Sequence, residues 1–136
     1  MSDRGLRVAA ALVALAGLGV AAYLTWAHYA DESVICVTGG GCDTVQESTY
    51  SEIAGIPVAA LGVVAYAAIL ALVTWDTPAA RLAAAAIALV GLLFSSYLLV
   101  LQLFVIDAIC VWCVANDVVI APALAVLTGL RLRTTP

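Results

Sequence analysis

Residues 110–130, CVWCVANDVVIAPALAVLTGL, place two cysteines, Cys110 and Cys113, at the start of a long apolar run. Cysteines three residues apart in the first turn of a helix lie on one face, close enough to form a disulfide, and the positive end of the helix favours the thiolate of the first. This stretch therefore predicts a redox-active dithiol at a membrane surface. Two other interpretations remain open: a pair of small buried hydrophobic side chains, or part of a zinc site that uses all four cysteines of the chain.

The composition is typical of a membrane protein. Of the 136 residues, 65% are hydrophobic and 10% are charged, which leaves too few polar residues to cover a soluble globule of this size. The length predicts a single membrane domain over residues 1–136. The formal net charge of −4 and the absence of lysine argue against a nucleic-acid partner, because phosphate binding requires clustered basic residues.

Four apolar runs are long enough to cross a bilayer, which takes about 20 mostly apolar residues in a helix. We expect an all-α membrane protein whose four transmembrane helices cover residues 6–26, 57–75, 81–104 and 110–130, with a polar outer loop at 28–56 and a short connector at 105–109. Pro57 suits the first turn of its helix, and Asp76-Thr77-Pro78 breaks the second run. The first run also resembles a cleaved signal peptide, but a retained helix is preferred because the run exceeds the usual signal length of about 7 to 15 residues.

The basic residues predict the orientation in the membrane. Four crossings put the N-terminus, the connector at 76–81 and the C-terminus on one side, and these segments hold every basic residue: Arg4, Arg7, Arg81, Arg131 and Arg133. By the positive-inside rule this side is cytoplasmic. The acidic loop at 28–56 and both cysteine pairs then face the outside, where disulfide chemistry is favoured.

The outer loop contains the second cysteine pair, Cys36-Val-Thr-Gly-Gly-Gly-Cys42. The three glycines let the backbone turn back on itself and bring the two sulfurs within disulfide range. A purely structural disulfide is one interpretation. A flexible, exposed loop also suits a labile disulfide that exchanges with other thiols.

Two dithiols, one in a loop and one at the start of a transmembrane helix, favour a redox relay. Such a pair passes electrons from a soluble protein to a lipophilic acceptor, and the natural acceptor inside a bilayer is a quinone. Asp117 follows Cys113 by four residues, and therefore lies on the same helix face about 6 Å deeper at 1.5 Å per residue. A carboxyl group at that depth is a functional candidate. We expect it either to relay a proton to the quinone or to form an interhelical hydrogen bond; the candidate partners are Gln102, Ser95, Ser96 and Asn116.

The chain resembles bacterial homologues of vitamin K epoxide reductase. The resemblance covers nearly the whole sequence and lies in a combination of motifs: four apolar runs, a C-x5-C in the first outer loop, Cys42-Asp-Thr-Val-Gln-Glu-Ser48, Gly55-Ile-Pro57 before the second helix and a C-x-x-C at the start of the fourth. It implies a four-helix bundle around a quinone pocket, with a short helix of the outer loop covering the active site. The unrelated four-helix quinone-linked disulfide generator of bacteria has its two cysteine pairs in the reverse order.

The resemblance also implies a role for each cysteine. Cys36 meets the thiol of a partner protein, Cys42 passes electrons through a transient disulfide with Cys110, and Cys113 faces the quinone. Ser48 corresponds to a loop serine near the pocket of the family, and Asn116 and Asp117 are further pocket candidates. The implied partner is a separate thioredoxin-like periplasmic protein, the implied electron acceptor is menaquinone or ubiquinone without any metal, and the implied location is the bacterial inner membrane. A non-catalytic membrane subunit that binds metal through the four thiolates remains the alternative.

Overall fold

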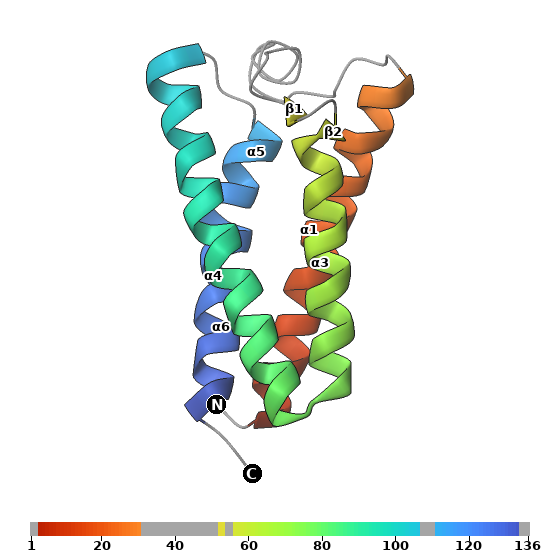
Figure 1. Cartoon of the computed structure of the whole chain (residues 1–136), viewed down its shortest axis with the longest axis vertical. Coiled ribbons are helices and arrows are strands. Elements are labelled where there is room, and N and C mark those ends of the chain that lie inside the picture. The colour runs from red at the N-terminus through yellow and green to blue at the C-terminus, as the bar shows by residue number, and fades with distance from the viewer. Residues whose placement is uncertain (1–2, 31–51, 54–55, 107–110, 134–136) are drawn as a thin grey trace.

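Four long helices dominate the computed structural model of the protein, which describes residues 3–30, 52–53, 56–106 and 111–133. They are α1 (Asp3–Ala30), α3 (Val58–Trp75), α4 (Pro78–Val100) with its π-helical continuation η2 (Leu101–Ile106), and a fourth helix formed by α5 (Val111–Ala115), the π-helical segment η3 (Asn116–Ile120) and α6 (Ala121–Arg133) (Figure 1). Each of the four is long and apolar enough to cross a membrane. The expectation of four transmembrane helices is confirmed.

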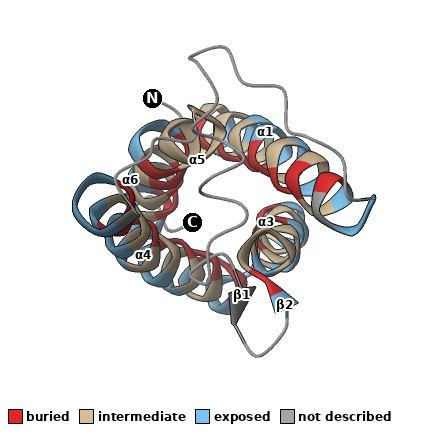
Figure 2. Cartoon of the chain, turned by 90° about the horizontal axis from the view of Figure 1, so that it is seen from above, coloured by how far each residue is buried: buried red, intermediate tan, exposed pale blue. Residues whose placement is uncertain are grey.

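The helices stand side by side and form a ring when viewed from the end (Figure 2). Their buried residues face the interior of this ring, and their exposed residues face outward. α1 packs against α3 and α6, and α4 packs against α3 and α6. The contacts use small side chains at helical spacing, namely Ala10, Ala14 and Ala21 on α1 and Ala80, Ala84 and Ala88 on α4. Small residues at this spacing let helices approach closely, as is usual inside membranes.

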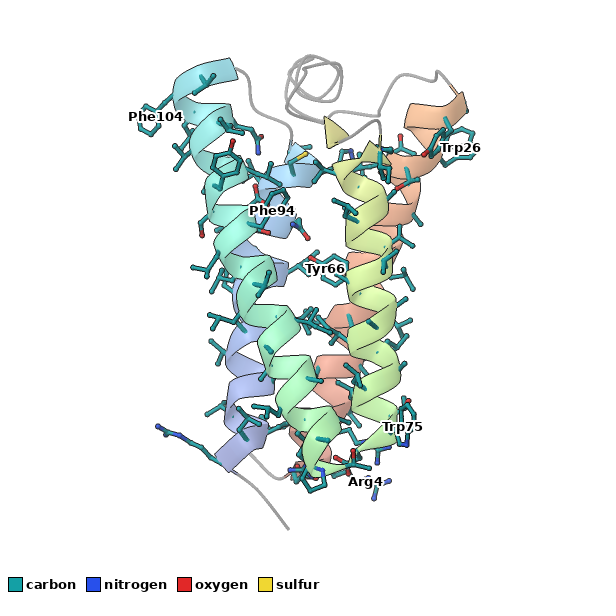
Figure 3. All side chains as sticks on the ribbon, viewed as in Figure 1. Arg4, Trp26, Tyr66, Trp75, Phe94 and Phe104 are labelled. Atoms are coloured by element: carbon teal, nitrogen blue, oxygen red, sulfur yellow. The ribbon has the colours of Figure 1, made fainter. Side chains whose placement is uncertain are left out.

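The two ends of the ring differ in chemistry. The first turns of α1, the turn between α3 and α4, and the last turns of α6 lie together at one end, which we call the arginine end because it carries Arg4, Arg7, Arg81, Arg131 and Arg133. The opposite end, which carries Cys113, is called the cysteine end. Exposed Trp26 lies near the cysteine end and exposed Trp75 at the arginine end (Figure 3), as expected for aromatic residues at the two membrane interfaces.

The turn between α3 and α4 is tighter than the sequence suggested. Asp76 caps α3 in a left-handed conformation, with φ of 55°, and its N–H bonds to the carbonyl of Leu72. The Thr77 side chain then accepts a hydrogen bond from the N–H of Ala80, and Pro78 occupies the first turn of α4. The third helix therefore begins at Pro78 rather than at Arg81, because threonine before proline is a helix start signal as well as a break.

A two-residue hairpin precedes α3. Strand β1 (Glu52–Ile53) pairs antiparallel with β2 (Ile56–Pro57), with Glu52 opposite Pro57. Pro57 has an extended backbone, with ψ of 140°, and caps α3 instead of lying in its first turn. α1 continues to Ala30, so the helix extends into the segment that we expect to lie outside the membrane from residue 28, while its membrane-spanning part ends at Ala27. The short covering helix expected in the outer loop lies outside the described residues.

A π-helical turn interrupts the fourth helix just before a proline. Pro122 lies at the second position of α6 and has no N–H to donate, and its ring collides with the carbonyl four residues earlier in a regular α-helix. Segment η3 widens the helix directly upstream, where the N–H of Ala121 bonds to the carbonyl of Asn116. Such single-turn π segments are frequent at functional sites. Here the widened turn carries Asn116 and Asp117.

Buried ion pairs close the arginine end. Arg81 is 4% exposed and lies 3.0 Å from Asp76 and 3.1 Å from Asp3, measured between side-chain nitrogen and oxygen atoms. Arg131 is 1% exposed and also pairs with Asp76. Arg7 donates to the carbonyls of Val73 and Thr74. The cluster ties all four long helices together, because its members come from α1 (Asp3), the α3–α4 turn (Asp76), α4 (Arg81) and α6 (Arg131).

Candidate functional site

A cavity of about 540 Å³ lies inside the ring of helices. Most of its wall is aliphatic, from residues such as Leu24, Ile69 and Leu98, and all four long helices contribute to it. Its polar wall residues are Tyr66, Ser95, Gln102, Cys113, Asn116 and Asp117. An apolar cavity of a few hundred Å³ with a small number of converging polar groups is the usual form of a small-molecule site.

Cys113 forms part of the cavity wall near the cysteine end. It lies in α5, is half-buried, and packs with Trp112 against Leu24 and Ala27 of α1. The ring of Trp112 also meets the ring of Tyr23, with centroids 5.4 Å apart. These contacts pack α5 against α1 and place Cys113 beside the cavity.

Four helical segments supply a hydrogen-bonded polar network one turn deeper than Cys113. The hydroxyl of Tyr66 on α3 donates to Oδ1 of Asn116 on η3. The Nδ2 of Asn116 lies 3.1 Å from Oδ1 of Asp117 and 3.4 Å from Oγ of Ser95 on α4. The Nε2 of Gln102 on η2 lies 3.4 Å from the other carboxyl oxygen, Oδ2, of Asp117.

Asp117 therefore has the interhelical partner that one sequence interpretation expected. It is 5% exposed, and each of its two oxygens accepts a hydrogen bond from a side-chain amide. Ser95 hydrogen-bonds to the Asp117 carboxyl group as well as to Asn116, whereas the hydroxyl of Ser96 donates to the carbonyl of Leu92 in its own helix, 2.9 Å away. The carboxyl group also borders the cavity, which is the position that a proton relay needs.

Three of the predicted site residues are thus brought together. Cys113, Asn116 and Asp117 lie on one cavity wall. The other predicted residues, Cys36, Cys42, Ser48 and Cys110, lie outside the described residues. Within residues 3–30, 52–53, 56–106 and 111–133, no group of three or more His, Cys, Asp or Glu side chains gathers at a possible metal site.

Tyr66 is the site residue that sequence reasoning missed. It is a polar side chain in the middle of an apolar helix, α3, and it projects into the interior of the ring (Figure 3). A buried tyrosine hydroxyl nearly always needs a partner, so its position within the second apolar run was a usable signal. The partner, Asn116, is 50 residues away in sequence, and only the fold reveals the pairing.

Comparison with known protein families gives a match over most of the chain. Residues 8–128 match the sequence model described as the vitamin K epoxide reductase family.

Proposed function

Since the chain belongs to the vitamin K epoxide reductase family, whose enzymes are quinone-reducing disulfide oxidoreductases, we propose that it oxidises a thioredoxin-like protein and passes the electrons through its own cysteines to a membrane quinone. The protein is a multi-pass membrane enzyme of this class. The partner, the electron path and the identity of the quinone are the parts that we propose.

The observation that carries the proposal is the position of Cys113. It is a C-x-x-C cysteine, and it borders an apolar cavity enclosed by four membrane-spanning helices. A thiol exposed only to water has no access to a lipid-soluble oxidant, and a thiol buried in a packed core has no room for one. The arrangement brings a redox-active sulfur and a lipophilic substrate to the same place.

The cavity suits a quinone in shape and polarity. A quinone has an apolar ring with two carbonyl oxygens, and the mostly aliphatic wall carries a small number of polar side chains, among them Asn116, Asp117 and Gln102. Two residues of the wall are also exposed on the outer surface of the ring, Leu61 on α3 at 40% and Val90 on α4 at 66%. The isoprenoid tail of menaquinone or ubiquinone then extends into lipid between α3 and α4.

The electron path starts at the outer loop. A dithiol of the partner attacks the Cys36–Cys42 disulfide, so the partner becomes oxidised and the loop pair becomes reduced. Cys42 next attacks the Cys110–Cys113 disulfide at Cys110, which forms a transient Cys42–Cys110 disulfide and releases Cys113 as a thiolate. Cys36 then attacks Cys42, which re-forms the loop disulfide and releases Cys110 as a thiolate. The Cys110–Cys113 dithiol then gives two electrons to the quinone as its disulfide re-forms.

The quinone takes up two protons with the two electrons. Asp117 lies beside the cavity, one turn below Cys113, and we assign it the relay of a proton to a quinone oxygen. Asn116 and Gln102 hold its two carboxyl oxygens in place. We also assign Ser48 of the outer loop to the pocket, because it ends the motif Cys42-Asp-Thr-Val-Gln-Glu-Ser48.

The proposed orientation places the arginine end in the cytoplasm. All five arginines gather there, and the positive-inside rule assigns such an end to the cytoplasmic face. Both termini are then cytoplasmic, and the cysteines face the outside of a bacterial inner membrane. The single membrane domain over residues 1–136 works with a separate periplasmic partner.

The experiment is anaerobic mixing of reduced protein with menaquinone or ubiquinone, with quinol formation followed by absorbance. Wild-type protein is expected to form quinol, and Cys113→Ala is expected to form none. Equal rates for the two proteins would contradict the proposed mechanism. A Trp26→Phe variant, changed at an exposed aromatic residue that is outside the cavity wall, controls for general damage to the protein.

A further inference from the structure

Gly17 lies in the middle of α1 and is absent from the cavity wall. A Cβ atom added to it would meet Tyr66 first: Cε1 and Cζ of the ring at 2.7 Å and Cδ1 at 2.9 Å. Distances below 3.0 Å are essentially never seen for a real Cβ, so the ring must shift if residue 17 has a side chain. Gly19 differs, because a Cβ there meets nothing within 4 Å.

The Tyr66 atoms nearest to a Cβ on residue 17 lie next to the tyrosine hydroxyl. Cζ bears the oxygen, and Cε1 is its neighbour in the ring, so a displacement of these atoms moves the hydroxyl itself. The three nearest atoms all belong to the Tyr66 ring, and none belongs to the backbone of α3. Gly17 therefore provides the space that the ring of Tyr66 occupies.

The hydroxyl of Tyr66 fixes the orientation of an amide. A side-chain amide has one carbonyl oxygen that accepts and one NH2 group with two donors. Because Tyr66 donates to Oδ1 of Asn116, the NH2 group of Asn116 points toward Ser95 and Asp117. With the amide reversed, Oδ1 would face the carboxyl oxygen of Asp117, and two acceptors would oppose each other.

We propose that Gly17 is a positioning residue for quinone reduction, which seats the ring of Tyr66 so that its hydroxyl holds the Asn116 amide with the NH2 group toward Asp117. This inference rests on the proposed function. Gly17 acts through Tyr66 and Asn116 and is not among the described residues that line the cavity. Its effect on turnover passes through a single hydrogen bond, the one between Tyr66 and Asn116.

A double-mutant cycle tests this relay. Quinol formation is measured with wild-type protein, Gly17→Ala, Tyr66→Phe and Gly17→Ala/Tyr66→Phe, and Gly19→Ala is the matched control for glycine replacement in the same helix. Gly17→Ala and Tyr66→Phe are each expected to lower kcat/KM about fivefold, the effect of one net hydrogen bond. The double variant is expected to equal Tyr66→Phe, since the hydroxyl on which Gly17 acts is already absent. Gly19→Ala is expected to equal wild type.

Any of four results would overturn the inference. The first three are wild-type activity of Gly17→Ala, a Gly17→Ala defect that adds in full to that of Tyr66→Phe, and a loss in KM alone, as for an obstructed cavity. If Gly17→Ala does not accumulate in the membrane, the change is repeated together with Tyr66→Leu, which removes the ring that the added Cβ would strike. Gly17→Ala/Tyr66→Leu is then expected to accumulate to the same level as Tyr66→Leu. Failure of this double variant to accumulate is the fourth result that overturns the inference. Wild-type protein that forms no quinol contradicts the proposed function, which is a separate outcome from any difference among the glycine variants.

Discussion

Gln102 on η2 donates a hydrogen bond from Nε2 to Oδ2 of Asp117 on η3, over 3.4 Å, and so joins one π-helical segment to another. Gln102 is 2% exposed and Asp117 is 5% exposed. Both side chains border the cavity. The widened turns of the third and fourth long helices thus carry the two polar groups that meet between them.

Removal of this amide is expected to destabilise the protein. Gln102→Leu leaves a buried carboxyl oxygen with one donor fewer, which costs about 1–3 kcal/mol. Unfolding in mixed detergent micelles measures the loss in the free energy of unfolding. Ser96→Ala is the matched control, because the exposed Ser96 hydroxyl bonds to the carbonyl of Leu92 in its own helix and so lies outside the Asp117 network. Its stability should stay near wild type. Equal stability of the two variants would contradict this role of Gln102.

The carboxyl group of Asp117 is expected to matter more for turnover than for folding. Asp117→Asn keeps the size of the side chain but removes its exchangeable proton and replaces one accepting oxygen with an NH2 group, which a reversed Gln102 amide can accept. If Asp117 relays a proton, quinol formation should fall about a hundredfold, within the usual range for general acid catalysis. The measurement is the pH profile of quinone reduction in both proteins. An unchanged rate and an unchanged profile would leave Asp117 with only its interhelical hydrogen bonds.

The ion cluster at the arginine end is expected to act on stability alone. Asp76→Asn removes the charge that faces Arg81 and Arg131, and asparagine tolerates the left-handed backbone of this position. The free energy of unfolding should fall by about 2 kcal/mol, a value between those for exposed and for buried ion pairs. Asp3→Asn should cost less, since Asp3 is 37% exposed. The KM for quinone should not change, and a raised KM would show that the cluster influences the cavity.

The orientation can be tested with single cysteines in a cysteine-free variant. A membrane-impermeant thiol reagent added to intact cells should label Ala30→Cys, at the cysteine end of α1, and should not label Thr77→Cys, at the turn between α3 and α4. The expectation follows from the positive-inside rule. Labelling of Thr77→Cys before cell lysis, with Ala30→Cys protected, would reverse the orientation.

The four long helices were predictable because the length of an apolar run is a strong signal. Their local details were less so. The apolar pattern predicts only a break at Thr77-Pro78, although threonine before proline also starts a helix. It does not predict the π turn at Asn116, although Pro122 disturbs the turn before it. In both cases the signal was present in the sequence but has more than one structural solution.

The site was predictable only in part, for a physical reason. Cys113, Asn116 and Asp117 lie within five residues of one another, so the spacing along one helix was enough to place them on a common wall. Tyr66 joins them from another helix through Asn116. A contact between distant segments depends on how the helices are rotated against each other, and the sequence pattern does not determine that rotation.

The central claim is that electrons pass from the loop cysteines through Cys110 and Cys113 to a quinone, and the most direct test is the number of quinols formed by fully reduced protein. The protein is reduced, freed of reductant under anaerobic conditions, and mixed with excess quinone. Four cysteines form two dithiols, so wild type should form two quinols per chain, Cys36→Ala/Cys42→Ala one, and Cys113→Ala none. Two quinols from Cys113→Ala would contradict the account, because electrons would then reach the quinone without the sulfur that borders the cavity.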